Sequence, residues 1–308
     1  MFRASLLLLA YNQSEVVREA ALSCLSQDCE PIEIIFSDDC SSDETYATLC
    51  EIASQYVGPH TVVVRRNDYN LGIAGHYNAL VKLANGSLLV TAAGDDVSEV
   101  CRVRDLLAAW AKDTSIDLIA SQVVRVDSHG SLLNQVVTVD DLSKWCSPQQ
   151  WCKKRPHVIG ATHAFTKRLW DRFGDIAANV PYEDQVMAFR ATCLGGGLTV
   201  NKPLVKYREG GLSSKQKATN RQERHAAIRS RYGKQLATYA QIRRDMLTVG
   251  LNLLWRGKTA RYLHRAAAAL AIVGAYEQSR STWQTLATHG RRCGFFWTAR
   301  QIWYTWRT

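Results

Sequence analysis

The chain has 308 residues, of which 46% are hydrophobic and 21% charged, a composition that is ordinary for a globular protein able to bury a substantial core. Its apolar stretch over residues 266–275 is far shorter than the ~20 residues that a membrane-spanning helix needs. Nine Cys form no CxxC pair and no Cys/His spacing suited to zinc, which favours free thiols in a reducing compartment.

The net charge of +10 is distributed unevenly along the chain. Residues 215–308 contain 18 Lys and Arg against 3 Asp and Glu, whereas residues 1–214 contain 20 against 25. This asymmetry suggests an acidic catalytic body followed by a basic extension for an anionic surface. Solvated helix faces explain the same charges equally well.

Strands and helices alternate over the first ~130 residues, which predicts a parallel sheet flanked by helices. The expected strands are 4–10, 32–37, 61–65, 87–92 and 118–126. Helices are expected between them, with Ser14, Ser41 and Ser98 as the capping residues.

The pattern becomes less regular over residues 128–214, as expected of a substrate-binding half. Thr166 could cap a helix that runs through Phe173, and Glu183 opens another through Leu194. Residues 215–308 read as helices rich in Arg, Ala and Trp.

Two acidic pairs follow buried strands of the predicted sheet. Asp38-Asp39 ends the second strand, and Gly94-Asp95-Asp96 follows the fourth. Because ligands of open α/β sheets bind at the carboxyl ends of the strands, both pairs should face one site. Asp95 and Asp96 suit Mg²⁺ or Mn²⁺, and Asp38 and Asp39 could accept hydrogen bonds from a ribose and a base. The alternative is that these residues cap turns and helices.

A third acidic pair, Glu183-Asp184, lies at the start of a predicted helix. A carboxylate at the same sheet edge could act as a general base. Stabilisation of the helix dipole is the alternative for either residue taken alone.

The order of these motifs resembles the family 2 inverting glycosyltransferases, which have the GT-A fold. The resemblance covers roughly residues 4–214 and rests on the segments 9–12, 36–45, 70–72, 78–80, 93–96, 182–185 and 202–208. It implies an α/β fold of the GT-A type, Rossmann-like, with a mostly parallel central sheet flanked by helices.

The resemblance also implies roles for individual residues. Tyr11, Asp38 and Asp39 would hold the nucleotide, with Asp39 near the base. Asp95 and Asp96 would form the metal site, with Asp96 ahead of Asp95 as the direct ligand. Asp184 would be the catalytic base that deprotonates the acceptor hydroxyl, and Glu183 its neighbour in the Glu-Asp motif.

Three positions depart from the pattern of these relatives. Ala93 stands where an acidic residue is usual, Tyr77 where an Arg is frequent, and Gly210 where a His is frequent. Contacts with the diphosphate would then fall to Arg208, Lys215 or Lys217.

Two domains are expected on this basis. Residues 1–214 would form a GT-A catalytic domain, with a nucleotide-sugar half over about 1–127 and an acceptor half over about 128–214. Residues 215–308 would form a basic, aromatic-rich helical extension.

The implied activity is transfer of a sugar from a nucleotide-diphosphate donor, with a UDP-sugar favoured, to a saccharide or a lipid-linked saccharide. The setting would be cell-surface polysaccharide biosynthesis, in the cytoplasm or peripherally at the inner face of the cytoplasmic membrane. A sugar nucleotidyltransferase is the rival enzyme, although residues 11–15 lack its Gly-rich basic loop. A catalytically inactive GT-A-fold carbohydrate-binding module is the rival without turnover.

The C-terminal segment 291–307 mixes Arg with aromatic residues. Phe296, Ile302, Trp303 and Trp306 could form an interfacial helical face on an anionic membrane. A helix docked on protein is the alternative, and no recognisable nucleic-acid-binding module is present. His76, His157 and His163 show no paired ligand spacing and are expected to be structural.

Overall fold

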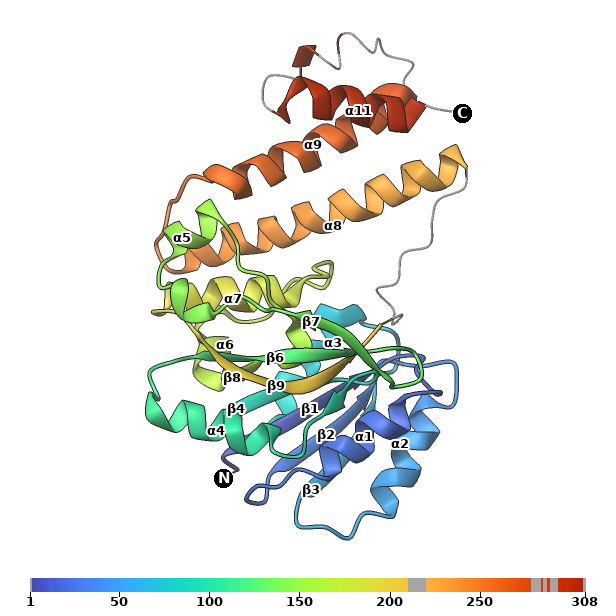
Figure 1. The fold of residues 1–308 in the computed structure, drawn as a ribbon, viewed down its shortest axis with the longest axis vertical. Helices are drawn as coiled ribbons and strands as arrows, with labels where there is room; N and C mark the ends of the chain where they lie inside the picture. Colours follow the sequence, from blue (N-terminus) through green and yellow to red (C-terminus); the bar gives the residue numbers. More distant parts are fainter. Residues whose placement is uncertain (1, 210–219, 278–283, 285–286, 289–292, 307–308) are drawn as a thin grey trace. The chain divides into compact units, whose positions relative to one another are not determined.

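The computed structural model describes residues 2–209, 220–277, 284, 287–288 and 293–306. The chain divides into two compact units (Figure 1). The first unit comprises residues 1–148, 156–178 and 183–214, and the second comprises 149–155, 179–182 and 215–308. The assignment of catalytic and extension roles to these parts stays a prediction.

The first unit is built on a sheet that begins with four parallel strands in the order β3-β2-β1-β4. These are β1 (Ala4–Ala10), β2 (Glu33–Asp38), β3 (Thr61–Arg66) and β4 (Leu88–Ala93). The sheet continues from β4 through β8 (Ala164–Thr166), β6 (Leu118–Val126), β9 (Leu198–Arg208) and β5 (Val97–Ser98), and β7 (Leu132–Val137) pairs with β6. Strand β8 runs antiparallel to both β4 and β6, whereas β6 and β9 are parallel.

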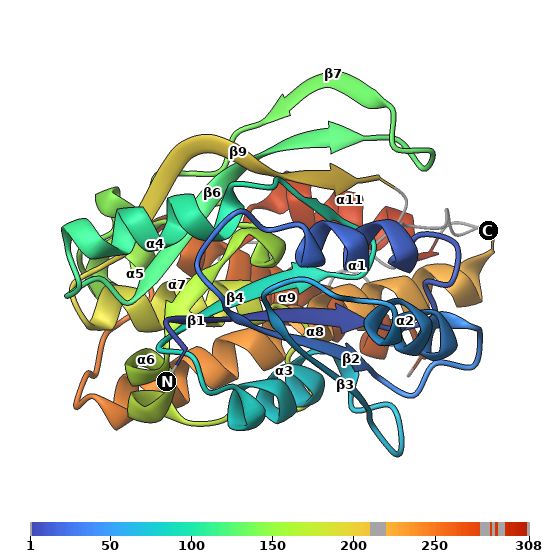
Figure 2. The same cartoon turned by 90° about the horizontal axis from the view of Figure 1, so that it is seen from below.

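Helices cover both faces of this sheet, which is why β1 and β4 are almost continuously apolar and buried. One face packs against α1 (Val17–Leu25), α2 (Thr45–Ser54) and α4 (Arg102–Lys112). The opposite side holds α3 (Gly72–Leu83), α6 (Lys167–Phe173) and α7 (Glu183–Cys193), as the view along the sheet shows for α3 and α6 (Figure 2). This arrangement confirms the expected α/β fold with a central, mostly parallel sheet flanked by helices.

Short helices lie in the connection between β7 and β8: η1 (Leu142–Lys144), α5 (Pro148–Lys153) and η2 (Gly160–Thr162). They were not foreseen, and neither was β8. A three-residue strand is too short to leave a periodic pattern, so sequence reasoning has nothing to detect there.

The predicted helix caps were mostly wrong. Helices α1, α2 and α4 start without a side-chain cap. Ser41 instead accepts a hydrogen bond from the Asn12 amide at 2.9 Å, and Ser98 lies in β5. The Ser41 hydroxyl thus joins two loops, and the Ser98 hydroxyl accepts from Arg102 Nη1 at 2.9 Å rather than from a backbone amide at the start of α4. Thr166 is the exception, because its side chain accepts from the Leu169 amide at the start of α6, as predicted.

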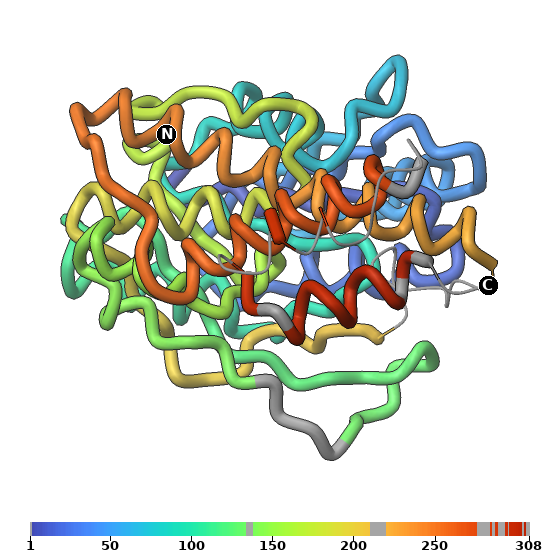
Figure 3. Tube along the Cα trace, turned by 90° about the horizontal axis from the view of Figure 1, so that it is seen from above, coloured from blue at the N-terminus to red at the C-terminus, as the bar shows by residue number. Residues whose placement is uncertain are grey.

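The second unit is helical, with α8 (Arg221–Thr248), α9 (Gly257–Glu277) and α11 (Phe295–Trp306). Helices α8 and α9 pack along each other as a hairpin, which the tube trace follows through the turn between them (Figure 3). Ile228, Ala269 and Val273 form its small apolar core, with Tyr232 and Trp297 packed against them. Within the part of the chain that the structure describes, no helix combines the length and hydropathy needed to cross a bilayer.

The expected interfacial face of the C-terminal segment is wrong at one position. Ile302 is only 6% exposed, because the α11 stripe of Thr298, Ile302 and Thr305 is buried. Phe296 and Trp303 are 96% and 61% exposed. The Trp306 side chain, Arg291, Arg292 and Arg307 lie outside what the structure describes.

Candidate functional site

A pocket of about 410 Å³ opens at the carboxyl ends of β1 and β4. Four of its lining residues are site residues expected from the sequence, and they come from four separate segments of the chain. These are Tyr11 after β1, Asp39 after β2, Asp95 after β4 and Glu183 at the start of α7. Segments distant in sequence therefore meet in one cavity, as the sheet topology requires.

Gly94 allows the loops after β1 and β4 to approach each other. A Cβ atom at this position would lie 2.4 Å from Gln13 Oε1 and 3.0 Å from the Ala10 Cβ. Gln13 Oε1 in turn accepts a hydrogen bond from the Tyr11 amide at 3.2 Å. A side chain at position 94 would crowd Ala10 and displace Gln13 from its contact with the Tyr11 amide.

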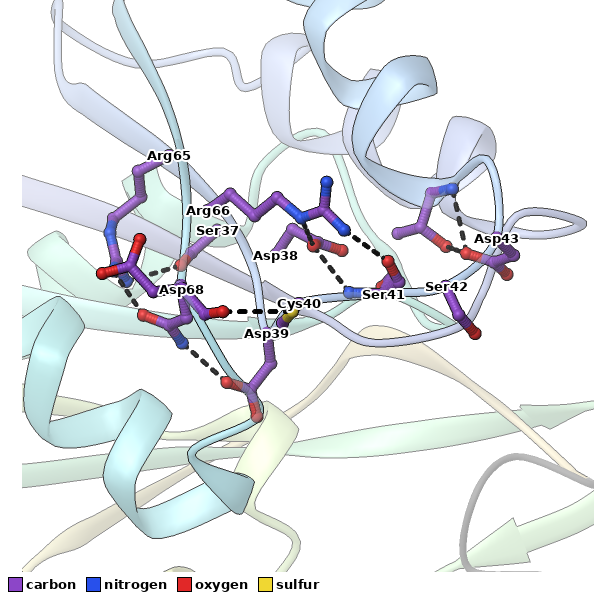
Figure 4. Close-up of polar contacts among 12 residues, drawn as sticks. Ser37, Asp38, Asp39, Cys40, Ser41, Ser42, Asp43, Arg65, Arg66 and Asp68 are labelled. Atoms are coloured by element: carbon purple, nitrogen blue, oxygen red, sulfur yellow. Dashed lines mark hydrogen bonds and ion pairs between the residues drawn. The ribbon is translucent and has the colours of Figure 1, made fainter.

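Asp38 is fully buried at the end of β2 and belongs to the framework of its loop (Figure 4). Its Oδ2 accepts from the Ser41 amide at 2.8 Å and pairs with Arg66 Nε at 3.3 Å. Cys40 adopts a left-handed φ of 62°, which turns the chain back at this point. Asp38 does not line the pocket, so its predicted contact with the nucleotide stays a prediction that this geometry does not favour.

Asp39 faces the pocket and is held from behind. Its Oδ1 accepts from Asn67 Nδ2 at 2.6 Å and from the Leu71 amide at 2.9 Å. Arg65 donates both to Asn67 Oδ1 and to Ser37 Oγ, which makes the support continuous. Two donors on one oxygen fix the carboxylate and leave Oδ2, which has no hydrogen-bond partner among the described residues, available to a ligand.

In the second acidic pair the first residue faces the pocket. Asp95 lines the cavity, whereas Asp96 is 6% exposed and accepts from the Arg208 amide through Oδ1 at 2.9 Å. Asp96 Oδ2 is buried with no hydrogen-bond partner in the described structure. Burial, with the adjacent charge of Asp95, raises the pKa of Asp96 to about 7, and burial also raises the pKa of Asp95.

These two carboxylates fit a divalent cation. Asp96 Oδ2 is a buried acceptor without a hydrogen-bond partner among the described residues, and a hard cation beside Asp95 would satisfy it. The described residues contain no group of three or more His, Cys, Asp or Glu side chains able to hold a metal. A cation here would therefore need further oxygen ligands from water and from a diphosphate, which is how Mg²⁺ is often bound.

Arg208 lies elsewhere than expected for a residue that contacts the diphosphate. Its guanidinium is buried and donates to the Asp95 carbonyl at 2.9 Å, to the Ser128 carbonyl at 2.9 Å and to Glu19 at 2.5 Å. It is not a lining residue of the pocket. The arginine braces the backbone beneath Asp95, and sequence reasoning missed this role. Lys215 and Lys217 lie outside the described residues.

Glu183 and Asp184 begin α7, and Glu183 lines the pocket. Burial and the charge of Asp184 raise the pKa of Glu183 well above its ordinary range. Asp184 Oδ1 accepts from the Gln185 amide at 2.7 Å. Gly160 is required beside this pair, because a Cβ there would lie 2.6 Å from Glu183 Oε1.

Sequence reasoning also missed how Tyr77 and His76 contribute. Both line the pocket, and Tyr77 stacks on Phe165 with ring centroids 5.5 Å apart. His76 Nε2 lies 2.6 Å from Ser37 Oγ, and burial lowers the pKa of His76 to about 4, so its ring is neutral at physiological pH. The positions of Asn67 and Gly160 carried no signal in the sequence, since each matters only through a residue that is distant along the chain.

Comparison with known proteins places the site in context. A family model described as "Glycosyl transferase family 2" matches residues 5–165, slightly more than half of the chain. An uncharacterised protein of Mycobacterium tuberculosis is 32% identical over 93 residues, which are 30% of this chain and 26% of that protein. The Escherichia coli UDP-Glc:α-D-GlcNAc-diphosphoundecaprenol β-1,3-glucosyltransferase WfaP is 32% identical over 92 residues, 30% of this chain and 35% of WfaP. The matched segments thus span about a quarter to a third of these curated relatives.

Solved structures share the fold at low identity. TarS 1–349 of Staphylococcus aureus, in complex with UDP, superposes with a TM-score of 0.58 at 15% identity, covering 98% of this chain and 89% of that one. The mannosyltransferase PcManGT of Pyrobaculum calidifontis, in complex with GDP-Man and Mn²⁺, has a TM-score of 0.58 at 16% identity, covering 98% and 85%. A longer TarS structure is covered over 55% of its length. Together with the family match and the assembled motifs, these findings show that the chain belongs to glycosyl transferase family 2.

Proposed function

We propose that the protein is a metal-dependent inverting glycosyltransferase that moves a sugar from a nucleotide-diphosphate donor to an acceptor hydroxyl. The observation that supports this most strongly is the single cavity lined by Tyr11, Asp39, Asp95 and Glu183. A nucleotide sugar has a base, a diphosphate and a hexose in sequence, and these residues offer a ring face and three carboxylates around one space. The solved relatives with UDP and with GDP-Man lend the donor class further support.

The loop after β2 is proposed to hold the nucleoside. Asp39 Oδ2 would accept a hydrogen bond from the base edge or the ribose, and Tyr11 would contribute its ring. Because Asn67 and the Leu71 amide already hold Oδ1, little order is lost when a ligand binds. A UDP-sugar is the favoured donor.

Asp95 and Asp96 would hold Mg²⁺ or Mn²⁺, with Asp95 at the pocket and Asp96 behind it. When bound, such a cation supplies positive charge that stabilises the departing diphosphate. The protein's own contribution is to aim the two carboxylates. Arg208 does so by binding the Asp95 carbonyl through its side chain and Asp96 through its amide.

Asp184 is proposed as the general base. Asp184 adjoins Glu183, which lines the pocket, and the raised pKa of Glu183 favours the neutral form of that neighbour. The acceptor hydroxyl attacks the anomeric carbon and its proton passes to the carboxylate. The bond from that carbon to the diphosphate oxygen breaks, and the nucleoside diphosphate leaves on the opposite side, which inverts the anomeric centre. Ala93 stands where relatives usually have an acidic residue, so Asp95 and Asp96 would be the two carboxylates that this loop supplies to the cation.

The acceptor is proposed to be a saccharide or a lipid-linked saccharide in cell-surface polysaccharide biosynthesis. The WfaP name describes transfer to a diphosphoundecaprenol-linked sugar, and that similarity supports a lipid-linked acceptor for this chain. A cytoplasmic enzyme at the inner face of the cytoplasmic membrane would meet such an acceptor.

The test is product analysis of the purified protein with a panel of sugar nucleotides and Mg²⁺ or Mn²⁺. We expect release of a nucleoside diphosphate, through transfer or slow hydrolysis. Release of pyrophosphate from a sugar phosphate and a nucleoside triphosphate would identify a nucleotidyltransferase. Binding of saccharide without any turnover would identify a carbohydrate-binding module.

The Asp184→Asn variant sharpens this test. We expect turnover to fall about 100-fold or more while donor affinity stays near that of the wild type, because a general base acts only on the acceptor. Glu183→Gln is the matched control and should retain more activity, because Glu183 is already neutral in this account. Normal turnover of Asp184→Asn would remove Asp184 as the base.

A further inference from the structure

The turn between α8 and α9 presents an apolar groove of about 460 Å³ in the second unit. Two leucines at this turn are exposed far more than is usual for apolar side chains, Leu247 at 65% and Leu254 at 73%. The groove is lined by Arg243, Met246, Leu247, Gly250, Leu251, Asn252, Leu253, Leu254 and Trp255. The groove and the two exposed leucines lie together at one turn, which makes this turn a candidate interaction surface.

The exposed charged residues around the groove are all basic. Residues 243–261 contain five basic residues, all of them exposed: Arg243, Arg244, Arg256, Lys258 and Arg261. The segment contains one acidic residue, Asp245, which is 1% exposed and accepts from Gln241 Nε2 at 2.8 Å. The turn therefore combines apolar side chains with a cationic rim.

We propose that this turn, residues 243–261, docks the protein on the surface of an anionic lipid bilayer. Leu247 and Leu254 enter the headgroup region, and the surrounding cations meet lipid phosphates. This inference goes beyond the proposed transfer reaction and does not depend on it.

Other occupants fit the same surface less well. A nucleic acid would match the cations and leave the two leucines in water. A second copy of the same turn would cover the leucines but bring five cations against five. An anionic bilayer satisfies both features at once.

Helix α11 is the competing membrane face in this unit, since Phe296 and Trp303 are exposed on it. Arg300 is the one basic residue of the sequence between 295 and 306, however, so its charge complementarity to lipid is weaker. The two locations are distinguished by variants of each.

The experiment is sedimentation of the full chain with vesicles made from equal parts of phosphatidylglycerol and phosphatidylcholine, against vesicles of phosphatidylcholine alone. We expect binding to the anionic vesicles that weakens with salt. Arg243→Gln with Arg244→Gln should weaken this binding about tenfold or more, because each of the two arginines adds to the attraction between the turn and the anionic lipid. Leu247→Ser with Leu254→Ser should weaken it by a similar factor.

Arg231→Gln with Lys234→Gln is the matched control, because it removes the same charge from exposed positions of the same helix. Lys234 and Arg231 lie about 14 Å and about 18 Å along α8 from Arg243, beyond a Debye length at physiological salt, so binding should change less than about threefold. All variants should keep their helix content and their cleavage of soluble sugar nucleotides, which separates this proposal from the transfer activity.

The proposal is overturned if the wild type fails to bind anionic vesicles, or if the control pair weakens binding as much as the turn variants. It is also overturned if Phe296→Ser with Trp303→Ser abolishes binding while the turn variants bind normally. A change of oligomeric state in the Leu247 and Leu254 variant, with vesicle binding intact, would reassign the groove to self-association.

Discussion

The loops after β2 and β4 each present an acidic pair, but they use the two positions in opposite order. In the first loop Asp38 is buried in the framework and Asp39 faces the pocket. In the second loop Asp95 faces the pocket and Asp96 is buried. Asp38 is the last residue of β2 and Asp39 begins the bend after it, whereas Asp95 and Asp96 both lie in the turn between β4 and β5, so the two loops select the buried residue differently.

The two buried carboxylates also differ in how their charge is compensated. Asp38 has an ion pair with Arg66 and a backbone donor from Ser41, while its Oδ1 is buried with no hydrogen-bond partner among the described residues. Asp96 has one backbone donor and an oxygen without a partner. Asp38 thus has an ion-pair partner, whereas Asp96 has none among the described residues, a difference that a bound cation would remove under the proposed function.

The largest expected difference is in turnover. Asp95→Asn should lower kcat about 100-fold or more and abolish the metal dependence of donor binding, because it removes a carboxylate that would hold the cation. Asp39→Asn should instead raise KM for the donor roughly tenfold with kcat nearly unchanged. Steady-state kinetics with varied Mn²⁺ measures both. If both variants changed KM and kcat by the same factors, the proposed difference in role between Asp39 and Asp95 would be contradicted.

Substitution of the two buried carboxylates should change the free energy of unfolding in different directions. Asp38→Asn should destabilise the fold by about 2 kcal/mol, because the Arg66 and Ser41 donors lose a charged acceptor. Asp96→Asn should be neutral or stabilising in the absence of metal, because the uncompensated charge disappears and Oδ1 can still accept from Arg208. Urea unfolding of both variants in chelator compares them. A marked loss of stability in Asp96→Asn would contradict the account of its charge.

A smaller effect concerns the decrease in stability of the fold at acid pH. His163 immediately precedes β8, its carbonyl accepts from the Thr91 amide of the neighbouring β4 at 2.9 Å, and burial lowers the pKa of His163 to about 3. The unfolded chain binds a proton near pH 6.5 and the folded chain does not, so stability falls as pH decreases below that value. Between pH 7 and pH 5 the loss from this group is about 2 kcal/mol.

The His163→Gln variant should show a shallower decline of unfolding free energy over the same pH range, whatever its stability at neutral pH. Denaturant titrations at pH 7, 6 and 5 provide the comparison. Parallel pH profiles of the unfolding free energy for variant and wild type would show that His163 does not contribute to the loss of stability at acid pH.

Much of the fold was accessible from the sequence because it is encoded locally. The strand expected at 118–126 matches β6, and 4–10 matches β1, since buried parallel strands leave continuous apolar runs. The pairing of β8 between β4 and β6 was not accessible, because three residues hold no periodicity and the contact is long-range. The helix caps failed for a related reason, since Ser41 and Ser98 serve contacts made only after folding.

The candidate site divides in the same way. The residue types and the motif order indicated which residues to expect in one cleft, and four of them line one cavity. Which acidic residue of each pair is buried depends on the single residue at which each strand ends. The sequence pattern does not locate strand ends that closely. The support of Asp39 by Asn67 and of Asp95 by Arg208 joins distant segments, so no local pattern announces it.

The most direct test is a crystal structure of this chain with a nucleoside diphosphate and Mn²⁺. The account predicts the base beside Asp39, and the diphosphate with its ion against Asp95, within the cavity that Glu183 also lines. A nucleotide bound outside this cavity, or an ion held by residues other than Asp95 and Asp96, would contradict it.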